Sequence, residues 1–287
     1  MKICRFNENR IGVVRDDSVF DVTAALDVLP AYRYPFPLGD ALVENLETLR
    51  PRMEELADAA TAIPASGVRF LSPVANPTKI IGVPQNYEEH AQETLADQAI
   101  SHGIPRRKME DQGLFLKANS ALVGPSEGVA IRFPDRRTDH EAELGVIVGR
   151  KGSDIAYDDA LSYVAGYAIA LDMVVRGRED RSFRKSVDTY AVLGPWMVTA
   201  DEVPDPGNID FFLSVDGEIR QKNNTRNLIL DLAGQIAWAS QFYTLHPGDI
   251  IMSGTCAGVT QVTPGDVMHL EFDGIAAMDV PVRAHVG

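Results

Sequence analysis

The 287-residue sequence has few cysteines, no long apolar run and little positive charge. Its two cysteines, Cys4 and Cys256, stand far apart and form no metal-ligand spacing, which argues against a disulfide framework and indicates a reducing compartment. No apolar stretch approaches the roughly 18 residues of a membrane helix, so we expect no membrane span. The opening MKICRFNENR places polar residues where a secretory signal carries its apolar core, which predicts a cytoplasmic protein.

The charge balance limits the possible partners. Lysine and arginine total 27 against 41 aspartates and glutamates, a formal net charge of −14, which argues against nucleic-acid binding because phosphate affinity needs basic patches. The 45% hydrophobic and 24% charged fractions are those of an ordinary globular protein. An anionic small-molecule substrate would therefore need a local reversal of the overall negative field.

Strand-like runs and turn signals predict an α+β, β-rich fold. Residues 1–73 mix short strands with an acidic helical segment and are expected to form a small α/β N-terminal domain, and the proline-bearing stretch at 72–78 marks its end. Residues 74–287 are dominated by strands separated by turns such as DG and PGD. Two helices are predicted there, at 86–100 with Asn86 as N-cap and at 231–245 with Asp231 as N-cap.

The stretch RTDHEAELGVIVGR places two like charges at the head of an apolar strand. Side chains alternate along a strand, so Glu141 and Glu143 project from one face, whereas His140 points to the other. Asp172 ends the apolar run YVAGYAIALD and offers a third carboxylate. An all-oxygen site of this kind favours Mg²⁺, Mn²⁺ or Ca²⁺ over Zn²⁺. A solvent-exposed strand edge is the alternative interpretation.

Three further features bear on chemistry. His90 and Glu93 lie three residues apart on the predicted helix, a spacing that lets a carboxylate orient an imidazole as a general base, although an incidental histidine on an exposed helix fits as well. RGREDRSFRK, at 176–185, is a basic cluster suited to binding an anion or is a solvated loop. SGTCAG, at 253–258, offers backbone amides and the Thr255 hydroxyl to a carboxylate, or is a plain turn.

The order of these features resembles the fumarylacetoacetate hydrolase family, in its acylpyruvase-like or 2-hydroxyhepta-2,4-diene-1,7-dioate isomerase-like branch. The resemblance covers about residues 78–285 and rests on six ordered stretches: IGVPQNYEEHAQE, GLFLKANSALVGP, DHEAELGVIVGR, YVAGYAIALDMVVRGRED, FRKSVDTYAVLGPW and PGDIIMSGTCAG. It implies a mixed β-sheet roll with few helices after a small N-terminal domain, and a homodimer.

The resemblance also implies roles for individual residues. The family's Mg²⁺ or Mn²⁺ ligands correspond to Glu141, Glu143 and Asp172. Its lid histidine and glutamate correspond to His90 and Glu93, which with Lys185 are the expected catalytic residues. The positions expected to bind substrate or stabilise charge are Lys117, Arg176, Glu179 and Thr255.

Two departures from the family pattern affect the expected substrate site. Cys256 replaces a proline of the common TGTPAG turn, which changes the stiffness of the expected carboxylate seat. Glu179 stands where some members have a glutamine that touches the substrate, and an acid there would repel a second substrate carboxylate.

These inferences predict a divalent-metal-dependent hydrolase that cleaves a carbon–carbon bond in a 2,4-dioxo acid of the acylpyruvate type. The same metal chemistry also supports isomerisation or decarboxylation of an unsaturated dioxo acid from aromatic catabolism, or decarboxylation of oxaloacetate. A non-catalytic ligand-binding protein is the third alternative.

Overall fold

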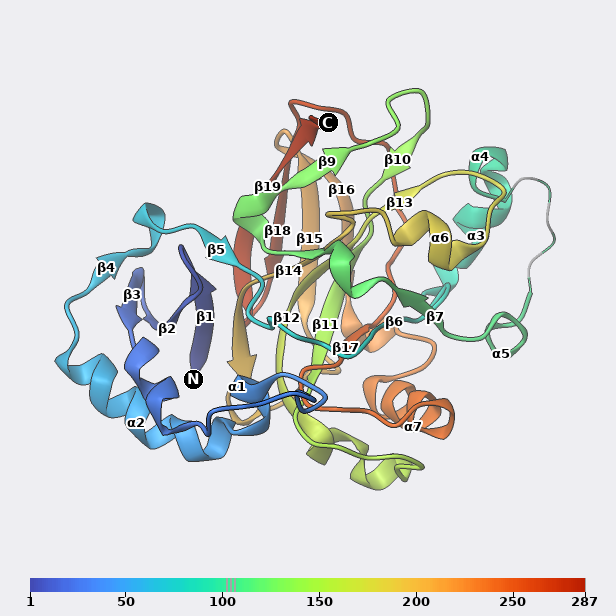
Figure 1. Cartoon of the computed structure of the whole chain (residues 1–287). Helices are drawn as coiled ribbons and strands as arrows, with labels where there is room; N and C mark the ends of the chain where they lie inside the picture. The colour runs from blue at the N-terminus through green and yellow to red at the C-terminus, as the bar shows by residue number, and fades with distance from the viewer. Residues whose placement is uncertain (102, 104, 106, 287) are drawn as a thin grey trace.

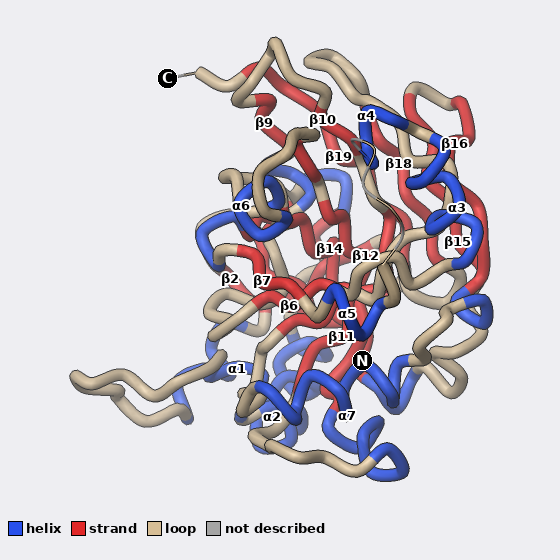
Figure 2. Tube along the Cα trace, turned by 90° about the vertical axis from the view of Figure 1, so that its right-hand side faces the viewer, coloured by secondary structure: helices blue, strands red, loops and turns tan. Residues whose placement is uncertain are grey.

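The computed structural model describes residues 1–101, 103, 105 and 107–286. Its β-sheets form the body of the molecule, and the helices lie at the periphery (Figure 1 and Figure 2). Within these residues the larger sheet has twelve strands in the order β4-β3-β2-β1-β14-β12-β11-β17-β6-β7, with β5 on β1 and β8 on β14. A five-stranded sheet has the order β16-β15-β18-β19-β9, and β10 pairs with β13. The predicted α+β, β-rich fold is confirmed.

The strands of the larger sheet are β1 (Lys2–Phe6), β2 (Arg10–Arg15), β3 (Ser18–Asp21), β4 (Ile63–Pro64), β5 (Phe70–Leu71), β6 (Ile80–Gly82), β7 (Phe115–Lys117), β8 (Leu122–Val123), β11 (Ala142–Val148), β12 (Val164–Asp172), β14 (Ala191–Thr199) and β17 (Ile250–Met252). The other strands are β9 (Val129–Ile131), β10 (Thr138–Asp139), β13 (Val174–Val175), β15 (Asp210–Val215), β16 (Glu218–Asn224), β18 (Val267–Phe272) and β19 (Ala276–Ala284). The helices are α1 (Ala41–Glu44), α2 (Leu46–Ala59), α3 (Glu88–Ala96), α4 (Gln98–Ser101), α5 (Met109–Gln112), α6 (Arg181–Lys185) and α7 (Leu232–Phe242).

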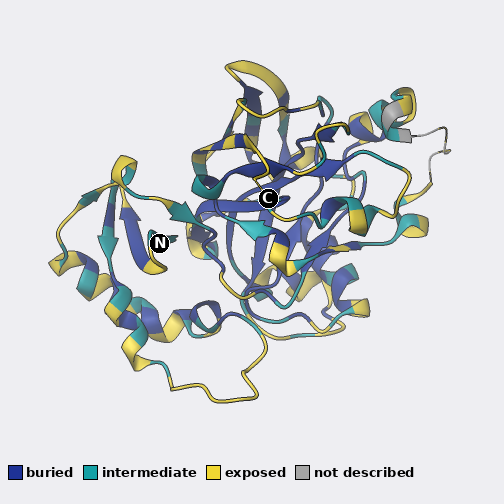
Figure 3. Ribbon diagram, turned by 45° about the horizontal axis from the view of Figure 1, so that its top comes forward, coloured by how far each residue is buried: buried dark blue, intermediate teal, exposed yellow. Residues whose placement is uncertain are grey.

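β11 and β12 form the centre of the larger sheet and are covered on both faces. Leu144 and Val146 of β11 enter a core shared with the five-stranded sheet, whereas Ile147 enters a second core that includes residues of α2. Burial of both faces explains why these strands read as nearly continuous apolar runs. Figure 3 shows the consequence, with buried central strands and exposed residues concentrated on the outer helices and loops.

The N-terminal segment continues the larger sheet. β1 pairs antiparallel with β14, β2 and β3 follow as a meander, and α2 packs against them through the buried side chains of Leu49 and Met53 (Figure 1, blue). The expected boundary between domains at residue 73 falls in the connection from β5 to β6. Because hydrogen bonding of the sheet runs through both parts, division into two domains stays a prediction.

Of the two predicted helices, the first is broken in the structure and the second begins at its predicted cap. The first is broken at Asp97 into α3 and α4, and Asn86 is not its N-cap. The Asn86 side chain instead donates to the carbonyl oxygens of Leu230 and Ser253, at 2.9 and 2.8 Å, because it is buried and joins three separate segments. Asp231 caps α7 as predicted and accepts from the Gly234 amide at 2.8 Å. None of the helices in the described ranges combines the length and apolar character needed to cross a bilayer.

Candidate metal centre and active site

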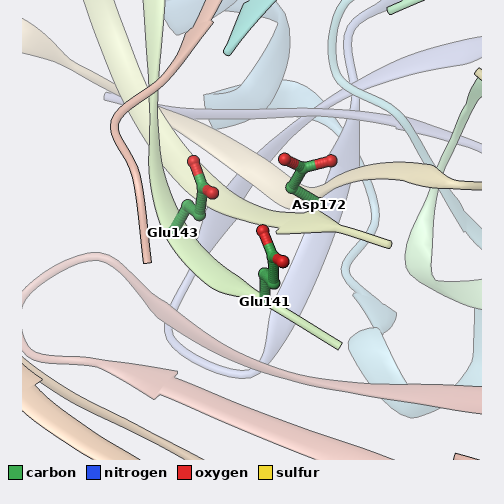
Figure 4. A group of neighbouring side chains, drawn as sticks. All are labelled: Glu141, Glu143 and Asp172. Carbon is green, nitrogen blue, oxygen red and sulfur yellow. The ribbon is translucent and has the colours of Figure 1, made fainter. Parts of the chain in front are cut away.

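The carboxylates of Glu141, Glu143 and Asp172 converge at the end of the two central strands (Figure 4). Glu143 lies opposite Ala170 in the antiparallel register, and the Asp172 amide donates to the Glu141 carbonyl oxygen at 2.9 Å. Alternation along each strand then directs all three side chains to one face. One oxygen from each lies within 4.8 Å of the others, and all three residues are buried.

The cations around these carboxylates are unevenly distributed. Lys185 donates to Glu141 at 2.6 Å and also to Asp172, Lys117 donates to Asp172, and a guanidinium nitrogen of Arg176 lies 3.3 Å from Glu141. Although burial acts to raise it, the pKa of Glu141 is held below its ordinary value by the charges of Lys185 and Arg176. Glu141 is therefore ionised and electrostatically compensated.

Glu143 lacks such compensation. Its carboxylate accepts from the Gly254 amide at 2.7 Å, and within the part of the chain that the structure describes it forms no ion pair. Burial and the neighbouring Asp172 charge raise the pKa of Glu143 well above its ordinary value. A buried set of three carboxylates, one of them uncompensated, suits a hard divalent cation, and these oxygens fit Mg²⁺ or Mn²⁺.

His90 faces the same centre from helix α3. It lines a cavity of about 90 Å³, here named the inner cavity, together with Glu141 and Glu143. Its Nδ1 is bonded to a Glu93 carboxylate oxygen at 3.0 Å, and the other Glu93 oxygen accepts from the Gly258 amide at 2.8 Å. Burial acts to raise the pKa of Glu93, but the bonds from His90 and Gly258 lower it below its ordinary value. An ionised Glu93 thus fixes the imidazole, leaving Nε2 as the free basic nitrogen.

The remaining predicted residues divide into two groups. Lys185, Arg176 and Thr255 line the inner cavity, and Lys117 lies behind it, fully buried against Asp172. Glu179 lies apart, because its carboxylate forms two hydrogen bonds with Arg136, at 3.1 and 2.9 Å. Glu179 lines neither the inner cavity nor the larger cavity beside it. Glu179 is thus paired with Arg136 in this structure, and its contact with substrate stays a prediction.

Two supporting residues were missed in the sequence. Asp139 is buried and receives Arg137 and Arg176, each at 2.7 Å, so it holds Arg176 against Glu141. Asp139 lies two residues before Glu141 and therefore on the same face of an extended chain, and this spacing could have identified it from the sequence. Gln221 of β16 donates to the Thr255 hydroxyl at 2.7 Å and accepts from the Ala142 amide at 3.0 Å. No sequence pattern marks Gln221, because its partners come from distant segments.

His140 lies on the other side of the chain, as its position in the alternation predicted. Its ring nitrogens are bonded to Gln221 and to the Thr260 hydroxyl, both at 3.0 Å, and burial lowers its pKa to about 4. His140 is thus a neutral structural residue that helps to hold Gln221 in place.

Comparisons with known proteins agree with this geometry. Residues 79–283 match the model of the fumarylacetoacetate (FAA) hydrolase C-terminal family, which is most of the chain. The chain belongs to the fumarylacetoacetate hydrolase family. The predicted family is therefore confirmed, and with it the assignment of the chain as an enzyme of this metal-dependent class.

Individual members of the fumarylacetoacetate hydrolase family extend the comparison. The chain is 52% identical to a maleylpyruvate hydrolase of Aquipseudomonas alcaligenes over 286 residues, covering 99% of this chain and 100% of that one. It is 37% identical to the mitochondrial oxaloacetate tautomerase Fahd2a of Rattus norvegicus over 209 residues, 71% of this chain and 64% of that one. The crystal structure of maleylpyruvate hydrolase from Sphingobium sp. SYK-6, in complex with manganese (II) ion and pyruvate, matches with a TM-score of 0.85 at 39% identity, with both chains fully covered.

The structure also accounts for the departure from the family pattern at Cys256. The Cys256 carbonyl oxygen accepts from Gln221 at 2.9 Å, and its thiol is buried and lies 3.4 Å from the Ala257 carbonyl oxygen. Gln221 therefore fixes the turn that carries Thr255.

Proposed function

We propose that this protein is a divalent-metal-dependent hydrolase that cleaves the carbon–carbon bond of an acylpyruvate-type 2,4-dioxo acid, with maleylpyruvate as the best candidate substrate. The observation that carries the proposal is that His90, which is held by Glu93, lines one cavity with Glu141 and Glu143 of the carboxylate centre. A metal centre alone polarises a keto acid, whereas hydrolysis also requires a base that activates water. The similarity to two maleylpyruvate hydrolases supports the choice of substrate.

The carboxylate centre and the His90–Glu93 pair have separate tasks in this reaction. A divalent cation held by Glu141, Glu143 and Asp172 supplies Lewis-acid polarisation of the keto acid. His90 takes a proton from water through Nε2, while Glu93 holds the ring and stabilises the imidazolium that forms. The resulting hydroxide adds to the distal carbonyl carbon, and cleavage of the adjacent carbon–carbon bond releases a carboxylic acid and the enolate of pyruvate.

The pyruvate half requires positive charge where its own negative charge develops. Lys185 and Arg176 line the inner cavity and carry that charge, and the Thr255 hydroxyl is held by Gln221 at its edge. Lys117 is buried behind Asp172, where it offsets the charge of the carboxylates. Protonation of the enolate at carbon then yields pyruvate.

Keto–enol tautomerisation of oxaloacetate is the second candidate function. The relatives named oxaloacetate tautomerase favour it, and the enolate-stabilising half of the site would serve it without His90 acting on water. Isomerisation or decarboxylation of an unsaturated dioxo acid would use the same enolate-stabilising half. A ligand-binding role without turnover would require neither that half nor His90 as a base. The products of the reaction separate these functions.

A product assay tests the proposed function. We expect purified protein with Mn²⁺ or Mg²⁺ to convert maleylpyruvate into equal amounts of pyruvate and maleate, and EDTA to remove the activity because three carboxylates alone do not polarise the substrate. Chromatography of the products against time is the measurement. Release of CO₂, a change of absorbance without fragmentation, or turnover that persists in EDTA would contradict the proposal.

We further infer that the protein is a cytoplasmic homodimer. Family membership supports the assembly, and the two free, buried cysteines suit a reducing compartment. We expect light scattering on a sizing column to give about twice the 31.3 kDa of one chain. A mass of one chain across the micromolar range would refute the dimer.

A further inference from the structure

The inner cavity continues into a larger one. This second cavity, here named the outer cavity, has a volume of about 320 Å³. Its walls share with the inner cavity the residues Gln85, Thr94, Ile100, Phe115, Arg181 and Arg184. A substrate whose keto acid end reaches the three carboxylates therefore has its other end in the outer cavity.

Two arginines stand where the cavities meet. Arg181, Arg184 and Lys185 lie at positions i, i+3 and i+4 of the short helix α6, a spacing that places their side chains on one face. Lys185 reaches the metal centre, while the guanidinium groups of Arg181 and Arg184 line both cavities. The Arg181 guanidinium also lies over the Phe115 ring, 5.4 Å from its centroid.

Both of these guanidinium groups lack a directly paired carboxylate in the described part of the chain. Among the described residues, neither Arg181 nor Arg184 forms an ion pair with a carboxylate, whereas Arg136, Arg137 and Arg176 all do. Arg181 donates to the Gln112 side-chain oxygen at 2.6 Å, and Arg184 donates to a backbone oxygen at 2.9 Å.

The nearest acid in sequence, Asp180, is already engaged. It caps α6 by accepting from the Ser182 amide at 2.8 Å. Burial, together with repulsion from Arg176 and Arg181, lowers the pKa of Arg184, because these effects outweigh the attraction of the Glu141 and Glu179 charges. In a protein with a net charge of −14, two arginines that line a cleft and have no ion-pair partner among the described residues indicate an anionic ligand.

We propose that Arg181 and Arg184 bind a second, distal carboxylate of the substrate and make the enzyme selective for 2,4-dioxo acids whose acyl chain ends in a carboxylate. The inference rests on the proposed function and extends it to substrate choice. Guanidinium groups suit this task because their fixed fork of donors matches a carboxylate. Glu179, which would have repelled such a group, is held outside both cavities by Arg136.

Two matched substrates test the selectivity. We compare maleylpyruvate with its analogue in which the distal carboxylate is a primary amide, for the wild type, Arg181→Gln and Arg184→Gln. Only the substrate with a distal carboxylate forms charged hydrogen bonds to these arginines, so only that substrate loses them in the variants. We therefore expect each substitution to lower kcat/KM for maleylpyruvate roughly 10- to 100-fold and kcat/KM for the amide less than about 3-fold. Arg181→Lys should restore part of the loss, because it keeps the charge without the fork.

Arg178→Gln is the matched control. It removes the same charge from the same segment, but Arg178 is exposed and lines neither cavity, so both substrates should be turned over as in the wild type. An equal loss on both substrates in Arg181→Gln and Arg184→Gln, or no loss on either, would overturn the proposal.

A binding measurement separates this proposal from the proposed function. Calorimetry with maleate and with its monoamide, on Mn²⁺-loaded protein, reports the distal subsite without turnover. In the wild type we expect maleate to bind at least about tenfold more tightly than the monoamide. In Arg181→Gln and in Arg184→Gln we expect the two ligands to bind with equal affinity. If the wild type cleaves neither dioxo acid, the proposed function fails. If the wild type binds maleate and the monoamide equally, the distal subsite is refuted, whether or not the enzyme cleaves the dioxo acids.

Discussion

Glu143→Gln is expected to abolish divalent-cation binding while the protein stays folded. The amide keeps the shape of the side chain and an oxygen for the Gly254 amide, but it removes the one carboxylate of the centre that forms no ion pair in the described structure. At a Mn²⁺ concentration 100 times its dissociation constant, the wild type should gain about 2.7 kcal/mol of stability and the variant none. Calorimetry and thermal melting, each with and without Mn²⁺, measure the two effects.

The metal-free proteins provide a second comparison. Without a cation, Glu143 is a buried acid beside two other carboxylates, so its replacement by glutamine removes repulsion, and metal-free Glu143→Gln should melt above metal-free wild type. Glu47→Gln, at an exposed position on α2, is the control for the change of net charge and should alter neither property. Mn²⁺ affinity unchanged from the wild type in Glu143→Gln would show that these three residues are not the metal ligands.

The grouping of the three carboxylates could be predicted from sequence because it follows from local rules, whereas the preference for a metal centre over an exposed strand edge came from the family resemblance. Glu141 and Glu143 share a face through the alternation of an extended chain, and Asp172 ends the next strand, where an antiparallel partner returns to the same edge. The central strands were recognisable for the same reason, since burial on both faces leaves a continuous apolar run. No tertiary information was needed beyond the pairing of two neighbouring strands.

The walls of the site depend on contacts that no local rule supplies. Glu179 is bound by Arg136, 43 positions earlier in the chain, and lines neither cavity, whereas Arg181 lines both. The break between α3 and α4 coincides with an ion pair from Asp97 to Arg137, 2.8 Å long and 40 positions apart. Long-range ion pairs of this kind leave no periodic trace in the sequence.

His90→Ala is expected to lower kcat for hydrolysis roughly 100- to 10,000-fold, the usual contribution of a positioned general base. Mn²⁺ affinity should stay within about threefold of the wild type, because His90 lines the cavity without belonging to the group of three carboxylates. Stopped-time product assays and calorimetry give the two quantities. Deuterium exchange at the carbon next to the keto group of pyruvate provides a third, and it should persist because Lys185 and the carboxylates remain.

Glu93→Gln distinguishes a base held in place from a histidine that merely fills space. Glu93 accepts from both His90 and Gly258, whereas a glutamine side chain offers one oxygen for these two donors. We therefore expect a smaller loss of kcat than in His90→Ala, and little further loss when the two substitutions are combined, since both act through one imidazole. Full additivity in the double variant, or hydrolysis at the wild-type rate in His90→Ala, would remove His90 from the mechanism and leave the enolate-stabilising half, which favours tautomerisation.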